Sequence, residues 1–117
     1  MRMIIAIIQP TKLSTVRDAL REMDVHSFSV CDAIGYGRQR GQIASFRGNE
    51  YRVELLRKIE LEILVRDELL EPTIETIRRH ALTGSAGQIG DGKIFVLPVA
   101  DAIDMEAGYA GAVEDDI

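Results

Sequence analysis

The chain has 117 residues, of which 46% are hydrophobic, and a formal net charge of −5 at pH 7. This length predicts a single domain over residues 1–117 with one aliphatic core. The negative charge argues against a nucleic-acid-binding protein, because no basic face is large enough to neutralise many phosphates. The apolar run at the start is too short for a signal peptide or a membrane span, so we expect a cytoplasmic protein without membrane insertion. The single cysteine, Cys31, is expected to be a small buried hydrophobe in a strand.

The first third of the chain predicts a strand, a helix and a second strand. Residues 1–9 form a short apolar run rich in β-branched side chains, and Pro10 closes it. Over residues 12–23 the apolar side chains recur at helical spacing, with charged residues on the opposite face. Between residues 26 and 35 larger apolar residues alternate with small or polar ones, which is typical of a strand.

After a long polar stretch, the same order of elements follows a second time. Residues 59–65 alternate as a strand, an apolar helical stripe runs from about residue 70 to 82, and residues 94–99 form a fourth strand. Two such units interleave into a ferredoxin-like βαββαβ sandwich, an α+β fold with a four-stranded antiparallel sheet and two helices on one face. The other face of the sheet is then uncovered. We expect other copies of the chain to cover it in a closed homo-oligomer.

Residues 35–58 connect the two halves and are expected to form a long loop. They contain several glycines and arginines and show no sustained helical or strand period. A structureless connection of this length is uncommon inside a compact domain, and it is usually either a functional arm or a disordered insertion. Phe46 and Tyr51 flank a polar segment that contains Arg47. The loop thus offers a phenol and a guanidinium to another molecule. We interpret the loop as a docking arm, with a flexible insertion as the alternative.

A second glycine-rich stretch, residues 83–93, precedes the last strand. Neither this stretch nor GYGRQRG at 35–41 fits a dinucleotide-binding or P-loop fingerprint, because the residue spacing or the required following helix is missing. Residues 90–93, GDGK, can still form an anion-binding nest of backbone N–H groups beside a lysine. A tight turn into the last strand is the alternative.

The sequence gives little indication of catalysis. The two histidines are far apart, no Cys–His cluster has metal-ligand spacing, and the serines lack an evident base. An acylphosphatase-like hydrolase on the same core would need an arginine and a nearby asparagine after the first strand, and residues 9–15 supply neither. We therefore expect a protein that is not an enzyme.

Three ordered motifs, together with QPTKLSTVRDAL at 9–20, resemble the PII family of nitrogen-regulatory signal-transduction proteins: GYGRQRG at 35–41, FRGNEYRVELLRK at 46–58 and TGSAGQIGDGKIFVLPV at 83–99. The resemblance implies a cytoplasmic homotrimer that binds ATP or ADP in clefts between subunits and senses 2-oxoglutarate alongside Mg-ATP. It implies control of nitrogen-metabolism partners, such as an ammonium channel, a transporter or an enzyme, through a T-loop. The T-loop falls at about 36–58, the phosphate-binding B-loop at about 83–93 and the C-terminal segment at 100–117.

The resemblance also implies a set of site residues. Gln39 and Lys58 fall where 2-oxoglutarate is bound, and Gln39 also meets the magnesium that accompanies ATP. Arg47, Glu50 and Tyr51 fall where the T-loop contacts its partners, and Tyr51 matches a tyrosine that some members carry uridylylated. The residues implied for the nucleotide are Ile7, Ser29, Gly35, Gly37, Arg38, Gln39, Glu62, Leu64, Gly90, Asp91, Gly92 and Lys93.

The chain departs from the family pattern where two arginines usually hold the nucleotide phosphates. DMEAG at 104–108 occupies that position, so Asp104 and Glu106 stand where the arginines would be. Two unit charges 4 Å apart interact by about 4 kcal/mol at an effective dielectric of 20, so both reversals oppose binding of a triphosphate. The B-loop is also longer, because Ser85, Ala86 and Gly87 have no counterpart. The alternative is therefore a divergent PII-like sensor that has lost ordinary ATP binding and reads another small ligand.

Overall fold

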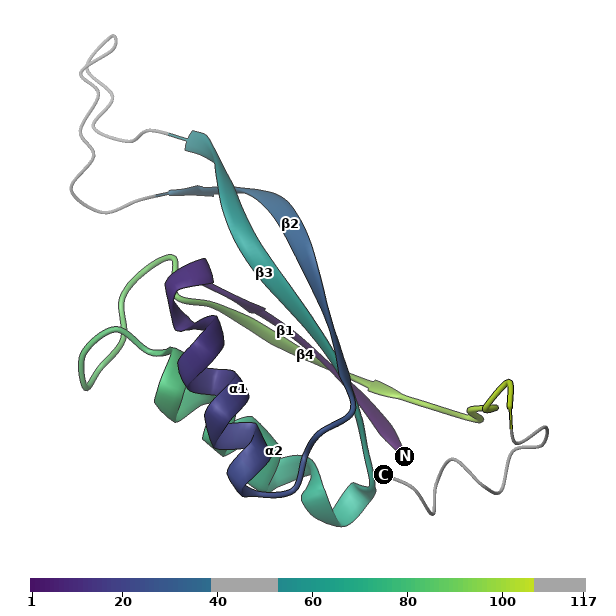
Figure 1. Ribbon diagram of the computed structural model, residues 1–117. Helices are drawn as coiled ribbons and strands as arrows, with labels where there is room; N and C mark the ends of the chain where they lie inside the picture. Colours follow the sequence, from purple (N-terminus) through teal and green to yellow (C-terminus); the bar gives the residue numbers. More distant parts are fainter. Residues whose placement is uncertain (39–52, 107–117) are drawn as a thin grey trace, which may run out of the picture.

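The computed structural model describes residues 1–38 and 53–106, with the side chains of residues 1–35 and 56–106. The described strands form one antiparallel sheet in the order β2-β3-β1-β4, and α1 and α2 cover one of its faces (Figure 1). This arrangement confirms the predicted ferredoxin-like sandwich. In chain order the elements are β1 (Arg2–Ile8), α1 (Leu13–Glu22), β2 (Phe28–Arg38), β3 (Val53–Val65), α2 (Leu70–Ala81) and β4 (Gly92–Pro98).

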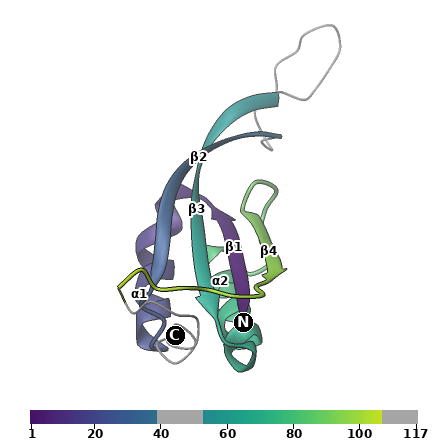
Figure 2. The same cartoon turned by 90° about the vertical axis from the view of Figure 1, so that its right-hand side faces the viewer.

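The core lies between the sheet and the two helices. On β1 every second residue is buried, and Ile4 stands opposite Ile63 of β3 and Val96 of β4. The helices bring Leu20 and Ile77 into the same cluster, where both are 0% exposed. Burying one such aliphatic side chain contributes about 1.5–3 kcal/mol, so the alternation of residues along β1 and β3 fixes which face of the sheet the helices cover. The opposite face, called the open face below, is covered by neither helix of the described residues (Figure 2).

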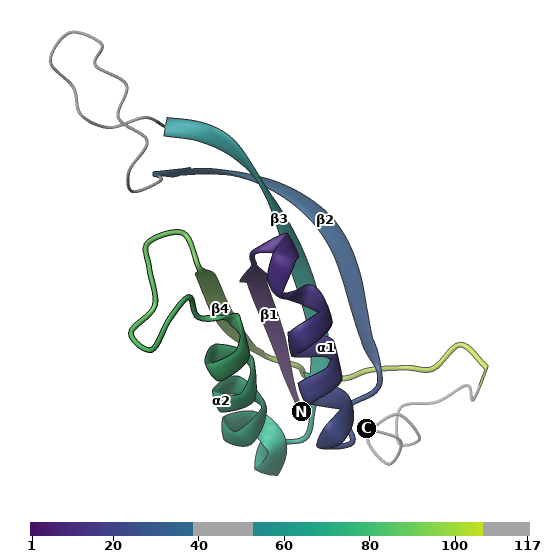
Figure 3. The same ribbon diagram turned by 60° about the vertical axis from the view of Figure 1, so that its left-hand side comes forward.

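The loop predicted over residues 35–58 was too long, because both flanking strands continue into it. β2 extends to Arg38, which pairs with Val53 of β3, so residues 36–38 and 53–58 are strand. This ribbon of two strands leads away from the helices (Figures 1 and 3). Pairing through backbone hydrogen bonds does not by itself require an apolar alternation, so these segments left no clear period in the sequence. Similarly, β4 begins at Gly92 and not at Ile94.

Cys31 is exposed, and the prediction that it is buried was wrong. β2 is an edge strand, and Phe28 and Val30 lie opposite the buried residues Ile63 and Leu61 of β3, on the side that the helices cover. Alternation along the strand places Cys31 on the open face, directly opposite Glu60 of β3. An apolar run on an edge strand therefore did not indicate which face was covered.

The C-terminus of α1 is closed by a Schellman-type turn that uses a residue other than glycine. Val25 N–H donates to the carbonyl of Leu20 at 2.9 Å, and Asp24 N–H donates to the carbonyl of Arg21 at 3.1 Å. Asp24 has a φ of 64°, a left-handed conformation that glycine adopts without the strain of a Cβ. The turn buries Val25 against the core. The strained conformation of Asp24 is therefore offset by the packing of Val25.

We therefore expect Asp24→Gly to stabilise the fold by about 0.5–1 kcal/mol, since it relieves the left-handed strain. The measurement is the urea unfolding midpoint at a fixed protein concentration. Asp18→Gly, at an exposed position inside α1, is the control and should destabilise by roughly 0.3 kcal/mol, because glycine is slightly poorer than aspartate inside a helix. Equal losses of stability in both variants would contradict this account of the turn.

Candidate ligand-binding site

A buried carboxylate organises the B-loop, which in the structure spans residues 82–91 between α2 and β4. Asp91 is 8% exposed and accepts hydrogen bonds from the Thr83 backbone N–H at 3.0 Å and the Thr83 hydroxyl at 2.6 Å. The backbone N–H of Gln88 donates to it at 2.7 Å, and Gln9 Nε2 donates at 3.1 Å. One side chain thus joins the start of the loop, its middle and the end of β1.

These contacts determine the charge state of Asp91. Burial by itself would raise the pKa of the carboxyl, but the Thr83 backbone and hydroxyl hydrogen bonds oppose it. With the Gln88 N–H and the positive charge of Lys12, they hold the pKa of Asp91 below its ordinary value. The group is therefore a carboxylate at neutral pH, and it is fully engaged in holding its own loop.

The backbone conformation requires glycine at both glycine positions of the GDGK segment. Gly92 has a φ of 132°, and a Cβ on it would lie 1.7 Å from the carbonyl oxygen of Ile7, so no side chain fits. Gly90 has a φ of 98°, which lets the loop reverse just before β4. The tight turn and the close approach to β1 are therefore both present at this end of the sheet.

The Gly90 carbonyl is the point where the B-loop meets β3. Lys58 Nζ donates a hydrogen bond to this oxygen at 2.5 Å, and Gln9 Nε2 lies 3.4 Å from it. Lys58 belongs to the part of β3 that leads into the ribbon, so this hydrogen bond connects the B-loop to the base of the T-loop. The sequence analysis did not predict Gln9 and Thr83. Both act by donating hydrogen bonds to Asp91, and no local sequence pattern indicates such contacts.

The predicted nucleotide residues of the sheet lie on the open face in two neighbouring groups. Ile7 and Lys93 are directly opposite each other on β1 and β4, next to the B-loop. Ser29 and Glu62 pair across β2 and β3, and with Leu64 they line a shallow hollow of about 420 Å³. Met3, Ser27 and Phe28 complete the lining of that hollow, and none of these three was predicted.

The other predicted residues are placed only in part. Gly35 is on β2 opposite Leu56, and Gly37 and Arg38 continue that strand, where the backbone pairing is described. Gln39, Arg47, Glu50 and Tyr51 lie outside the described residues.

The two acidic residues of the C-terminal segment follow β4. Residues 99–106 leave the end of that strand on the side of the sheet opposite the helices (Figures 1 and 2). Asp104 is half-buried, Glu106 is exposed, and Met105 between them is 98% exposed. Across the described residues neither carboxylate makes an ion pair.

A separate groove of about 390 Å³ lies between α2 and the β1–β4 side of the sheet. Its walls are mainly aliphatic, with Ile74 and Ile77 from α2 and Ile94 and Val96 from β4. Arg78 is the one charged helix residue in the lining, while Asp91 and Lys93 border it at the B-loop end. Sequence patterns predicted the helix and the strand but not a gap between them.

The fold and this site describe a ferredoxin-like protein whose glycine-rich loop is fixed against one end of the sheet. The family model for Nitrogen regulatory protein P-II matches residues 1–109. A nitrogen regulatory protein P-II of Bradyrhizobium diazoefficiens is 45% identical over 111 residues, which cover 95% of this chain and 96% of that protein. The chain belongs to the P-II family of nitrogen regulatory proteins, as its motifs indicated.

Two further relatives show how widely the similarity extends. Nitrogen regulatory protein GlnK1 of Methanosarcina mazei is 43% identical over 111 residues, covering 95% of this chain and 94% of that protein. Nitrogen regulatory protein P-II 1 of Escherichia coli K12 is 44% identical over 108 residues, covering 92% and 94% respectively. Within residues 1–38 and 53–106, neither helix is long and apolar enough to cross a lipid bilayer.

The lowered pKa of Asp91 predicts a pH-dependent contribution to stability. A carboxyl whose pKa is lowered by folding stabilises the protein above its ordinary pKa of about 3.9. That contribution is lost as the pH falls through the lower, folded value. Asp91→Asn, which turns an acceptor into a group with its own donors, should destabilise by about 1–3 kcal/mol at pH 7.

The difference in unfolding free energy between the wild type and Asp91→Asn should shrink as the pH is lowered from 6 toward 2. Urea titrations across this range measure it. Asp101→Asn is the control, because Asp101 is exposed and, among the described residues, accepts a hydrogen bond only from the adjacent backbone N–H of Ala102. A difference that stays constant with pH would show that the charge of Asp91 does not hold the loop.

Proposed function

We propose that this protein is a regulatory, non-enzymatic sensor that binds adenylates and 2-oxoglutarate in clefts between the subunits of a homotrimer. Bound effectors select a conformation of the T-loop, which then docks to or leaves a nitrogen-metabolism partner in the cytoplasm. An ammonium channel, a transporter or an enzyme are the candidate partners. The single observation that carries the proposal is the P-II family match over residues 1–109, and the B-loop built around Asp91 is consistent with it.

The open face supports assembly with other copies. Phe95 and Leu97 of β4 are 49% and 45% exposed on it, and Met3 and Ile5 of β1 lie beside them in the same cross-strand rows. A contiguous apolar surface on a sheet is usually covered by another protein surface. Copies of the same chain would cover it by closed symmetry.

The position of the predicted nucleotide residues supports a shared cleft. The B-loop group, with Lys93 and Ile7, and the hollow lined by Ser29, Glu62 and Leu64 occupy different parts of the open face. A subunit packed against this face can bring its B-loop group to the hollow of its neighbour. The exposed ammonium of Lys93 and the backbone N–H groups of the GDGK turn then serve the phosphates.

The Lys58 hydrogen bond supports a route from effector to T-loop. A dicarboxylate such as 2-oxoglutarate competes with the Gly90 carbonyl for the Lys58 ammonium, because a charged acceptor binds an ammonium more strongly than a neutral carbonyl. When Lys58 changes partner, the Gly90 carbonyl of the B-loop loses its ammonium donor and the dicarboxylate gains it. Both changes occur at the base of the ribbon that carries residues 39–52.

Asp104 and Glu106 favour a second candidate function, in which the protein has lost ordinary ATP binding and reads another small ligand. Both carboxylates stand where the family pattern expects arginines, and neither is neutralised by an ion pair within the described residues. Near a triphosphate each would repel the ligand rather than bind it. A less charged ligand would not suffer this repulsion.

Calorimetric titration with ATP, ADP and AMP, with and without magnesium and 2-oxoglutarate, separates the two candidates. We expect the double variant Asp104→Arg/Glu106→Arg to bind ATP at least about tenfold more tightly than the wild type, because a hydrogen bond to a charged group contributes about 1.5–3 kcal/mol. Asp101→Arg is the control, since it adds positive charge to the same segment at a position outside the predicted site.

The wild-type result decides which function holds. ATP binding that tightens with 2-oxoglutarate supports the adenylate sensor. No wild-type binding, with binding restored in the double variant alone, supports the divergent sensor. No ATP binding in any of these proteins, or an equal gain in Asp101→Arg, contradicts a nucleotide site at this position.

A further inference from the structure

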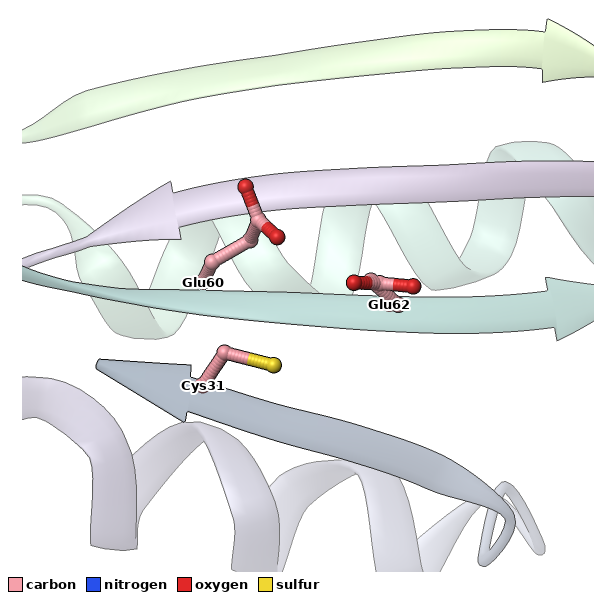
Figure 4. A group of neighbouring side chains, drawn as sticks. All are labelled: Cys31, Glu60 and Glu62. Atoms are coloured by element: carbon pink, nitrogen blue, oxygen red, sulfur yellow. The ribbon is translucent and has the colours of Figure 1, made fainter. Parts of the chain in front are cut away.

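Three side chains with metal-ligating atoms meet on the open face: Cys31 of β2 and Glu60 and Glu62 of β3, called the Cys31 cluster below. Cys31 is directly opposite Glu60, and Glu62 is two residues further along the same face. The sulfur and one oxygen from each carboxylate lie within 4.8 Å of one another. Figure 4 shows the three side chains rising from two adjacent strands on the same side of the sheet, with the helices behind.

The two carboxylates of the Cys31 cluster have no cationic partner among residues 1–35 and 56–106. Neither Glu60 nor Glu62 takes part in an ion pair or a side-chain hydrogen bond there. Lys58 lies two residues before Glu60 on the same face, and its ammonium donates a hydrogen bond to the Gly90 carbonyl instead. Two like charges therefore stand side by side beside a thiol, while the nearest lysine along the strand is engaged elsewhere.

Lys93 does not supply the missing charge. It lies in the same cross-strand row as Cys31 and Glu60, but the strand β1 with Ile7 separates it from Glu60. A small divalent cation between the three side chains would neutralise both carboxylates at once. It would need no backbone change, because the donor atoms are already close and their side chains end in rotatable bonds.

The donor atoms indicate which kind of cation fits. Magnesium and calcium prefer sets made wholly of oxygen, and a sulfur ligand is foreign to them. One thiolate with two carboxylates suits a borderline divalent transition metal such as Zn²⁺ or Co²⁺. Three protein ligands also leave a fourth tetrahedral position open for water or for a group from another chain.

We propose that the Cys31 cluster is a binding site for a divalent transition-metal ion of the zinc class. On binding, the S–H bond of Cys31 breaks, its proton passes to the buffer and a sulfur–metal bond forms, with no change in oxidation state. The bound ion links β2 to β3 just below the ribbon that both strands form. It therefore fixes the edge strand whose continuation leads into the T-loop.

The test is a titration of the chelator-treated, full-length protein with Co²⁺, followed by absorption spectroscopy, and then displacement by Zn²⁺. We expect one Co²⁺ per chain and a thiolate-to-cobalt charge-transfer band. Cys31→Ser should abolish the band. Glu60→Gln and Glu62→Gln should keep the band at saturation but weaken binding by at least about tenfold, since even the loss of an indirect partner of a metal ligand has that effect.

Asp32→Asn is the matched control, because Asp32 is adjacent to Cys31 but faces the other side of the sheet, where it pairs with Arg57. It should leave the band and the affinity unchanged. A second readout is the rate of alkylation of Cys31 in the wild type, which Zn²⁺ should slow and Mg²⁺ should not. The Cys31 thiol is exposed in the single chain, so unfolding of the chain is not needed for either measurement.

The proposal fails if wild-type protein gives no charge-transfer band, if Cys31→Ser keeps it, or if Asp32→Asn weakens binding as much as Glu60→Gln. Glu62 is also a predicted nucleotide residue, so the titration is made without nucleotide. The absence of the metal site and the absence of nucleotide binding then give separate results.

Discussion

The hydrogen bonds to the Asp91 carboxylate hold the B-loop in place, and the proposed binding of ligand phosphates depends on the position of this loop. Its donors come from Gln9 at the end of β1, from Thr83 after α2 and from Gln88 inside the loop. Gly92, the next residue, approaches β1 too closely to carry any side chain. The loop therefore has a fixed position relative to the sheet. This position presents the Gly90 carbonyl to Lys58 and directs the chain into β4 with Lys93 on the open face.

The second constraint is that both helices in the described part of the chain lie on the same face of the sheet. The alternation of residues along the strands then places the predicted nucleotide residues of the sheet on the other face. Predicted nucleotide residues, exposed aliphatic and aromatic side chains and the Cys31 cluster share that surface. Subunit packing and ligand binding would thus depend on the same face. A change in subunit packing would therefore alter ligand binding, and the reverse, because both act on β2 and β3. These two strands continue into the T-loop.

Sequence patterns predicted the elements well where a buried face exists. β1, β3 near Ile63, α1 and α2 all pack on one core, and their apolar periods gave their positions to within a few residues. The ends of β2 and β3 were not predicted, because a ribbon away from the helices leaves no apolar period. Cys31 was misplaced for a related reason, since on an edge strand either face can carry small apolar residues. Asp91 was predicted at the site, but Gln9, 82 residues away, could be found only in three dimensions. The meaning of Asp104 and Glu106 came only from comparison with the family pattern.

The central claim is that each ligand cleft is completed by two chains, one giving the B-loop group and one the hollow beside Ser29. Complementation between two defective chains tests it most directly. Lys93→Ala removes the ammonium from the first half-site, and Ser29→Trp fills the hollow of the second. Each variant alone should bind ATP weakly, while trimers formed by co-expressing both should recover part of the wild-type binding, because some clefts combine two intact halves. Mixed assemblies that bind no better than either variant alone would contradict a shared cleft.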